Sequence, residues 1–191
     1  HFVLARAPEA PPGTRGISLF LVPKYLVDAD GSLGDRNDVE CVGVEHKLGI
    51  HASPTCVMAY GEQRGATAYL VGDINAGMRC MFTMMNHARL SVGLEGVSIS
   101  ERAYQLALSY AKDRVQGSIP GKPGRVTIIN HPDVRRMLMF MKAQTEAMRA
   151  LAYATAAAMD HAEHGSDAQE SAVRQARVDL LTPIVKGWCT E

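Results

Sequence analysis

Residues 77–114 decide the fold, and they read GMRCMFTMMNHARLSVGLEGVSISERAYQLALSYAKDR. Apolar residues recur here in four-three spacing, which is the pattern of one face of a long α-helix that packs against other helices. That row is Met78, Phe82, Met85, Arg89, Val92, Gly96, Ile99, Ala103, Leu106 and Tyr110. The spacing predicts a single helix from about Gly77 to about Arg114, with one charged residue in its apolar row.

Two further helices follow the glycine- and proline-rich stretch at residues 117–124. The first is expected from Pro132, which suits a first helical turn, to His164, ahead of Gly165 as a stop. The next begins after Asp167, and Pro183 should kink or break it unless its neighbours compensate. The inner face of the first is expected to hold Val134, Leu138, Met141, Met148 and Ala152. Long helices joined by short loops predict a bundle.

Before residue 75 the apolar residues come in short runs separated by turn formers, which is typical of strands and hairpins. Strands are expected at residues 17–22, 39–44, 55–60 and, as a short one, 66–71, with a polar turn at residues 28–32. The predicted fold class is therefore α+β, with part of an antiparallel β-domain at residues 1–75. The first long helices of an incomplete C-terminal helical bundle follow at residues 76–191.

Charge and composition argue against several classes of protein. Lys and Arg together number 20, as do Asp and Glu, so the net charge is zero and a nucleic-acid or anionic-membrane binder is not favoured. No apolar run approaches the roughly 20 residues of a membrane span. The four cysteines are widely spaced, which favours reduced, buried thiols in a cytosolic protein. His161 and His164 favour a role at a helix end over metal binding, so no metal site is expected.

Arg89 is the residue that departs from the apolar pattern. A buried guanidinium needs a carboxylate, a phosphate, a carbonyl cluster or water as its partner. Asn86 stands one turn earlier on nearly the same face. An intramolecular salt bridge explains Arg89 as well as a ligand site does. Gly93 and Gly96, in the same helix, indicate the close approach of another helix or of a flat ligand.

A local excess of positive charge covers residues 101–150, where nine Lys and Arg residues stand against four Asp and Glu residues. Its centre is the turn between two predicted helices, which is a plausible place for phosphates. A solvated cationic face is the alternative.

Six segments, in order, carry a resemblance to a known family: GISLFLVP at residues 16–23, KLGIHASPTC at 47–56, YLVG at 69–72, GM at 77–78, NHAR at 86–89 and AKDRVQG at 111–117. With them the chain resembles the flavin-dependent acyl-CoA dehydrogenases, from the middle β-domain into the C-terminal helical domain. The sequences of residues 47–56 and 72–89 resemble most the branch of the family that includes 3-methylmercaptopropionyl-CoA dehydrogenases.

The resemblance implies a reaction and its site. A glutamate removes the α-proton of an acyl-CoA, and hydride passes from the β-carbon to FAD, giving a trans-2-enoyl-CoA. Arg89, with Asn86 beside it, would bind substrate at the catalytic-base end of the cavity. Arg114 and Gln116 would reach the FAD of a neighbouring subunit, with Arg114 at the pyrophosphate, and His131 would contact flavin. A homodimer or homotetramer, an electron-transferring flavoprotein as partner and a cytoplasmic location are implied as well.

Three departures qualify the resemblance. The usual phenylalanine after Gln116 is replaced by Gly117, which puts stacking near the adenine in doubt. The catalytic glutamate is expected beyond Glu191, and Ala88 stands where a few relatives carry that glutamate. A flavin-contacting strand is expected before His1. We therefore expect residues 1–191 alone neither to dehydrogenate acyl-CoA nor to retain FAD well.

Two rival functions are compatible with the same sequence. One is an acyl-CoA oxidase, in which molecular oxygen takes the electrons. The other is a non-catalytic family member that acts as a binding module, for instance on DNA through its basic face.

Overall fold

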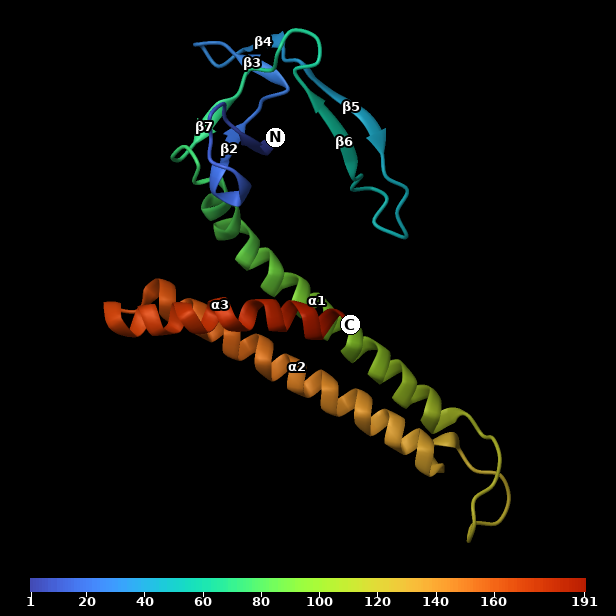
Figure 1. The fold of residues 1–191 in the computed structure, drawn as a ribbon. Coiled ribbons are helices and arrows are strands. Elements are labelled where there is room, and N and C mark those ends of the chain that lie inside the picture. The colour runs from blue at the N-terminus through green and yellow to red at the C-terminus, as the bar shows by residue number, and fades with distance from the viewer. The chain divides into compact units, whose positions relative to one another are not determined.

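The computed structural model describes residues 1–191 and divides into two compact units, residues 1–84 and 85–191. Short antiparallel strands come first along the chain, and three helices follow (Figure 1). The predicted α+β class is therefore confirmed. No helix is both long and apolar enough to cross a membrane.

The strands form three small antiparallel sheets. The first has the order β1 (Phe2–Arg6), β2 (Ile17–Leu21) and β7 (Tyr69–Val71). The second pairs β3 (Tyr25–Val27) with β4 (Leu33–Arg36), and the third pairs β5 (Val39–Val44) with β6 (Cys56–Tyr60). All four predicted strands are present, although the last is confined to three residues. Strands β1, β3 and β4 were not predicted.

The predicted polar turn at residues 28–32 is present, and it joins β3 to β4. Gly31 N donates to Asp28 O at 2.9 Å, and Ser32 N donates to Asp30 Oδ1 at 3.0 Å. Gly31 has a φ of 86°, in the left-handed region that glycine adopts without strain. The turn thus takes its conformation from Gly31 and from the Asp30 side chain, which accepts from the backbone.

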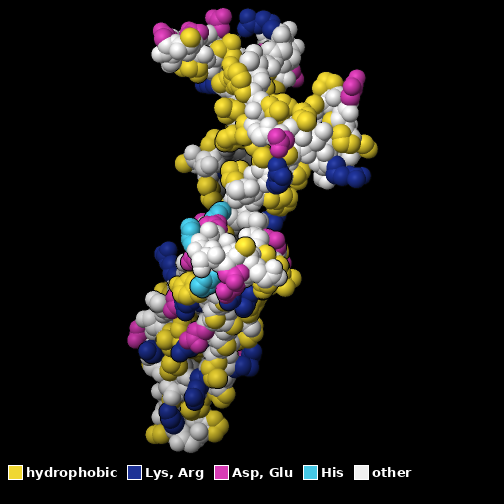
Figure 2. Space-filling view, turned by 90° about the vertical axis from the view of Figure 1, so that its left-hand side faces the viewer, with side chains coloured by type: hydrophobic (Ala, Val, Ile, Leu, Met, Phe, Trp, Pro, Cys, Tyr) yellow, Lys and Arg dark blue, Asp and Glu magenta, His cyan; other side chains and the backbone are white.

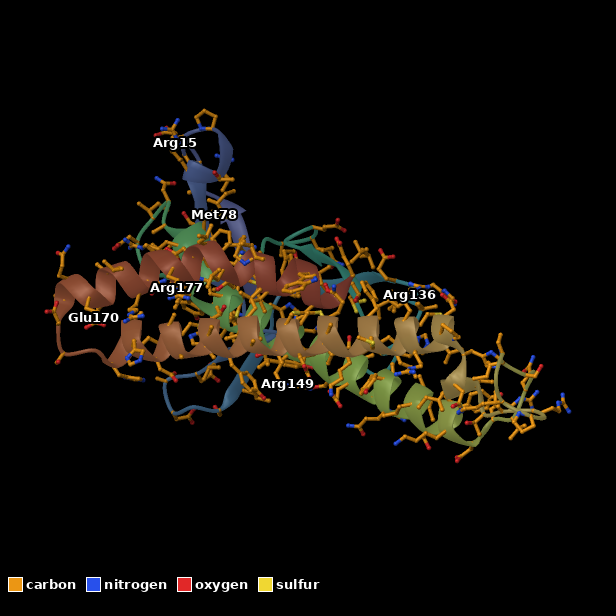
Figure 3. The ribbon with its side chains drawn as sticks, turned by 90° about the horizontal axis from the view of Figure 1, so that it is seen from below. Arg15, Met78, Arg136, Arg149, Glu170 and Arg177 are labelled. Carbon is orange, nitrogen blue, oxygen red and sulfur yellow. The ribbon has the colours of Figure 1, made fainter.

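The helices are α1 (Gly77–Asp113), α2 (Pro132–His164) and α3 (Ala168–Thr190), close to the predicted bounds. Pro132 opens α2, and Gly165 is its C-cap residue. Asp167 caps α3, because its Oδ1 accepts from Gln169 N at 2.8 Å and from Glu170 N at 3.0 Å. The short connection makes α2 and α3 an antiparallel hairpin, and the two helices run side by side (Figures 1 and 3).

The core of the second unit lies where the three helices meet. Its buried members are Leu90, Val97, Met148, Ala152, Ala158, Met159, Val178, Val185 and Cys189. The predicted inner face of α2 is buried or half-buried throughout. Thr145 and Thr155 are buried beside it, and each hydroxyl donates to the carbonyl four residues earlier at 2.8 Å. That local bond satisfies the hydroxyl and allows burial.

The packed face of α1 differs from the predicted row. Ile99, Leu106 and Tyr110 of that row are 69%, 71% and 59% exposed, whereas Leu90 and Val97 are buried. The row holds at Gly96, where a Cβ would overlap the Cys189 carbonyl, and α3 also approaches Gly93, where a Cβ would lie 2.5 Å from Val185 Cγ1. The backbone of α3 therefore sits on the glycine side of α1. This confirms the predicted close approach of another helix.

Two further predictions concern Pro183 and the cysteines. Pro183 does not break α3, which continues to Thr190, and the stated exception applies because Val178, Thr182, Val185 and Cys189 are buried on both sides of the proline. Packing therefore compensates for the hydrogen bond that proline cannot donate. The prediction of buried thiols holds only for Cys189. Cys41 is exposed on a two-stranded sheet, while Cys56 and Cys80 are half-buried.

Candidate functional site

Arg89 lines a cavity of about 500 Å³ between α1 and α3. Met85, Ala88 and Val92 join it from α1, since residues three and four apart share a helix face. Pro183, Lys186 and Gly187 form the opposite wall. Arg89 itself is half-buried. The cavity is thus largely apolar, and its lining includes two cationic side chains, Arg89 from α1 and Lys186 from α3.

This arrangement suits a ligand with an apolar chain and a polar group. The apolar walls can bury a hydrocarbon, and a guanidinium can donate to an oxygen that carries or develops negative charge. Asn86 is half-buried one turn away and is not among the residues that line the cavity. The α3 wall was missed from the sequence, because nothing in the periodicity of α1 indicates which part of α3 it meets. The nearest indication in the sequence was the pair Gly93 and Gly96, which predicted the close approach of another helix.

Arg114, Gln116 and His131 come together at the other end of α1. Gln116 N donates to Val126 O at 2.9 Å, Val126 N donates to Gly117 O at 3.0 Å, and Ile128 N donates to Arg114 O at 2.8 Å. These three hydrogen bonds join the end of α1 to the residues that precede α2. The joined segment, residues 114–131, is called the clasp below. The three residues that the resemblance implies for cofactor binding are therefore neighbours in the structure.

His131 is held in one orientation within this clasp. Its Nε2 lies 2.8 Å from Gln116 O, and since a carbonyl oxygen only accepts, Nε2 carries the proton. The His131 ring also fills the space beside Gly117, where a Cβ would lie 3.3 Å from Cε1. Gly117 has a φ of 71°, so a larger residue would be both strained and crowded. The side chains of Arg114 and Gln116 are exposed.

The local cationic excess is partly neutralised in the structure. Arg149 contacts Glu101 at 2.6 Å, Arg136 contacts Asp133 at 2.8 Å, and Lys142 contacts Glu146 at 3.7 Å. Figure 2 shows Lys and Arg side chains mixed with acidic and apolar ones on the face of the helices that it displays. A mixed surface of this kind does not favour a nucleic-acid interface, which normally gathers cations on one face.

Comparison with known proteins gives the chain its family. The family described as "Acyl-CoA dehydrogenase, C-terminal domain" matches residues 75–178, which include the whole of α1 and α2. The chain belongs to the acyl-CoA dehydrogenase family. The predicted family is thereby confirmed, and the matched residues include Arg89 and the segment 114–131.

Two curated family members show how far the similarity extends. A 3-methylmercaptopropionyl-CoA dehydrogenase from Ruegeria pomeroyi is 54% identical over the entire chain, which covers 32% of that enzyme. The broad-specificity linear acyl-CoA dehydrogenase FadE5 from Mycobacterium tuberculosis is 45% identical over 98% of the chain, again with 32% of the relative covered. The chain thus spans about a third of the length of these acyl-CoA dehydrogenases.

A solved structure shows the same fold. Caenorhabditis elegans ACDH-11, crystallised in complex with C11-CoA, matches 98% of the chain with a TM-score of 0.74 and 26% identity. The match covers 29% of that protein. The arrangement of short antiparallel strands followed by long helices is therefore one that a family member adopts.

Proposed function

We propose that this chain is part of an FAD-dependent acyl-CoA dehydrogenase that converts an acyl-CoA thioester into a trans-2-enoyl-CoA. The observation that carries the proposal is the apolar cavity beside Arg89, on a helix that belongs to this family. In this proposal residues 1–75 are the C-terminal part of the middle β-domain, and residues 76–191 open the helical domain. The 54% identity to a 3-methylmercaptopropionyl-CoA dehydrogenase favours a short acyl group as substrate.

Arg89 is proposed to act on the polar end of the substrate. The apolar side chains of Met85 and Val92 would lie against the acyl chain, while the guanidinium donates to oxygen at the thioester or at the catalytic carboxylate. Asn86, one turn away, is proposed as a second substrate contact. No residue within 1–191 is proposed as the base, which is expected from a glutamate elsewhere in the protein.

The clasp at residues 114–131 is proposed to contact FAD of a neighbouring subunit. Its chemistry fits: the Arg114 guanidinium is exposed and forms no salt bridge within the chain, so its planar fork is available to a pyrophosphate. Gln116 and His131 would bind beside it. FAD, when bound, accepts the hydride from the substrate β-carbon. This sharing of FAD implies a homodimer or homotetramer, with an electron-transferring flavoprotein as acceptor and the cytoplasm as location.

The decisive test is anaerobic reduction of the flavin in the full-length protein. We expect an FAD absorbance spectrum that bleaches on addition of 3-methylmercaptopropionyl-CoA or butyryl-CoA, with the matching enoyl-CoA as product. Reoxidation by an electron-transferring flavoprotein should be much faster than reoxidation by oxygen; the reverse would indicate an oxidase. A protein without flavin, or one whose flavin no acyl-CoA bleaches, would refute the proposal.

A matched pair of variants tests the FAD contact. Arg114→Gln removes the proposed pyrophosphate partner and should weaken FAD retention by about ten- to a hundredfold, which corresponds to one charge-assisted bidentate contact. Arg125→Gln changes an exposed arginine in the same connection and should leave retention unchanged. FAD content after dialysis, measured from absorbance, checks both. Equal retention in the two variants would remove Arg114 from the site.

A further inference from the structure

Cys41 and Cys56 lie on paired strands of the sheet formed by β5 and β6. Cys41 is directly opposite Met58. Cys56 stands two residues before Met58 on the same strand, so their side chains point to the same face. Since directly opposed residues also share a face, both thiols project from one side of this hairpin.

The two side chains are in contact. The Cys41 thiol donates to Gly43 O at 3.3 Å, and its proximity to the Cys56 thiol raises the pKa of Cys56, although fourteen residues separate the two along the chain. The strand register shifts between Cys41 and Gly43, and Val42 has no partner in the pairing. Cys41 and Cys56 are therefore diagonal neighbours across the two strands, and the bulge marks the place where the strand can adjust to bring the two sulfurs together.

The surroundings distinguish this pair from the other two cysteines. Cys41 is exposed and Cys56 half-buried, whereas Cys189 is buried and burial raises the pKa of its thiol. The nearby Cys41 thiol raises the pKa of Cys56, so Cys56 keeps its proton longer. The charge of Lys47 acts on Cys56 in the opposite direction. The Lys47 ammonium is held in the connecting loop by Ile50 O at 3.0 Å and Ser53 O at 2.5 Å.

We infer that Cys41 and Cys56 form a peroxide-sensitive dithiol that closes to an intrachain disulfide across β5 and β6. The Cys41 sulfur attacks one oxygen of hydrogen peroxide, the O–O bond breaks, and one water leaves as Cys41 becomes a sulfenic acid. The Cys56 sulfur then attacks the Cys41 sulfur, the S–O bond breaks, and a second water leaves with the Cys56 proton. The two sulfurs together lose two electrons, which reduce the peroxide. This modification is independent of the dehydrogenation proposed above.

Peptide mapping of the full-length protein tests the dithiol. The protein is treated with hydrogen peroxide, its remaining thiols are alkylated, and it is digested with trypsin under non-reducing conditions. Trypsin cleaves after Lys47, so the two cysteines lie on different peptides. We expect these peptides to be joined with the loss of two hydrogen atoms, and dithiothreitol should separate them. Dehydrogenase assays play no part in this readout.

Cysteine variants provide the controls. Cys41→Ser and Cys56→Ser should each abolish the joined peptide, and Cys56→Ser should leave Cys41 as a sulfenic acid that dimedone traps. Cys80→Ser changes a half-buried cysteine outside the pair and should leave the crosslink intact. The inference is overturned if wild-type protein keeps both thiols alkylatable after peroxide, if Cys41 is over-oxidised without a crosslink, or if the crosslink requires Cys80.

Discussion

Glu101 and Arg149 form the shortest ion pair between two helices, joining α1 to α2 at 2.6 Å (Figure 3 labels Arg149). Their side chains are 31% and 33% exposed. The hydrogen bonds from Arg149 and then from Gln105 hold the pKa of Glu101 below its ordinary value. The same pair raises the pKa of Arg149. At the scale of a single residue, this is where protonation is linked to the packing of the helices.

Glu101→Gln should therefore cost stability in a pH-dependent way. A carboxyl whose pKa is lowered by folding stabilises the fold above its unfolded pKa, about 4.3 for glutamate, and that contribution is lost as the pH falls through the lower folded value. We expect a small drop in Tm at pH 7 that disappears in acid. Glu146→Gln, at an exposed pair on α2, should change Tm less. Thermal melts from pH 7 to pH 3 check this, and a Tm difference that persists undiminished in acid would contradict it.

Asn37 is a buried residue whose side chain connects segments of the first unit, and the sequence pattern did not predict this role. It is only 6% exposed, and its Nδ2 donates to Pro23 O and Thr67 O at 2.8 Å each. Its Oδ1 accepts from Thr67 N at 2.9 Å. One side chain thus joins three segments of the first unit. Among neutral side chains, only those of Asn and Gln offer two N–H donors on one nitrogen together with a carbonyl acceptor, and that requirement leaves no periodic signal.

Asn37→Asp should destabilise the first unit by about 3 kcal/mol, because it turns two buried donors into acceptors that face carbonyl oxygens. Urea denaturation of the full-length protein, followed by a probe in the strand region, measures the change. A variant as stable as the wild type would show that these hydrogen bonds contribute little.

At the scale of the elements, the glycines of α1 determine how closely α3 packs. Gly96→Ala places a methyl group against the Cys189 backbone, so α3 must move. We expect a loss of about 1–3 kcal/mol from overpacking, despite the helix propensity of alanine. Gly187→Ala, on the facing helix, meets no atom within 4 Å and should stabilise by up to about 1 kcal/mol. Denaturation midpoints compare the two, and equal gains would contradict the packing described.

The sequence predicted the three helices well because caps and breakers such as Pro132, Gly165 and Asp167 act locally. It predicted their contacts less well. The whole apolar row of α1 was expected to be packed, yet Ile99, Leu106 and Tyr110 are exposed, and α3 contacts α1 at Gly93 and Gly96. Strands β3 and β4 were missed since three or four residues are too few for alternation to stand out.

At the scale of the whole molecule, the chain holds a third of the length of its relatives. We expect the 191-residue polypeptide on its own to retain FAD poorly and to leave acyl-CoA unchanged, because the proposed base lies outside it. Flavin absorbance and enoyl-CoA formation by the isolated polypeptide check this. Robust turnover would show that a residue within 1–191 serves as the base.

The candidate site was predicted only in part. Arg89 was predicted because a charge is costly in an apolar row. The resemblance to the family predicted Arg114, Gln116 and His131. Lys186 was not predicted, because an exposed lysine on α3 is ordinary until the cavity between the helices is known. Which residues of two helices share a cavity depends on tertiary packing, and a sequence pattern within one helix does not contain it.

The central claim is that the cavity beside Arg89 holds the acyl thioester, and rapid-reaction kinetics test it most directly. Flavin reduction by an acyl-CoA is followed anaerobically in wild type, Arg89→Gln, Arg89→Lys and, as a control, Arg102→Gln at an exposed site on α1. We expect Arg89→Gln to slow reduction by about 10²–10³-fold, Arg89→Lys to fall between, and Arg102→Gln to match the wild type. Reduction of the Arg89→Gln flavin at the wild-type rate would contradict the account.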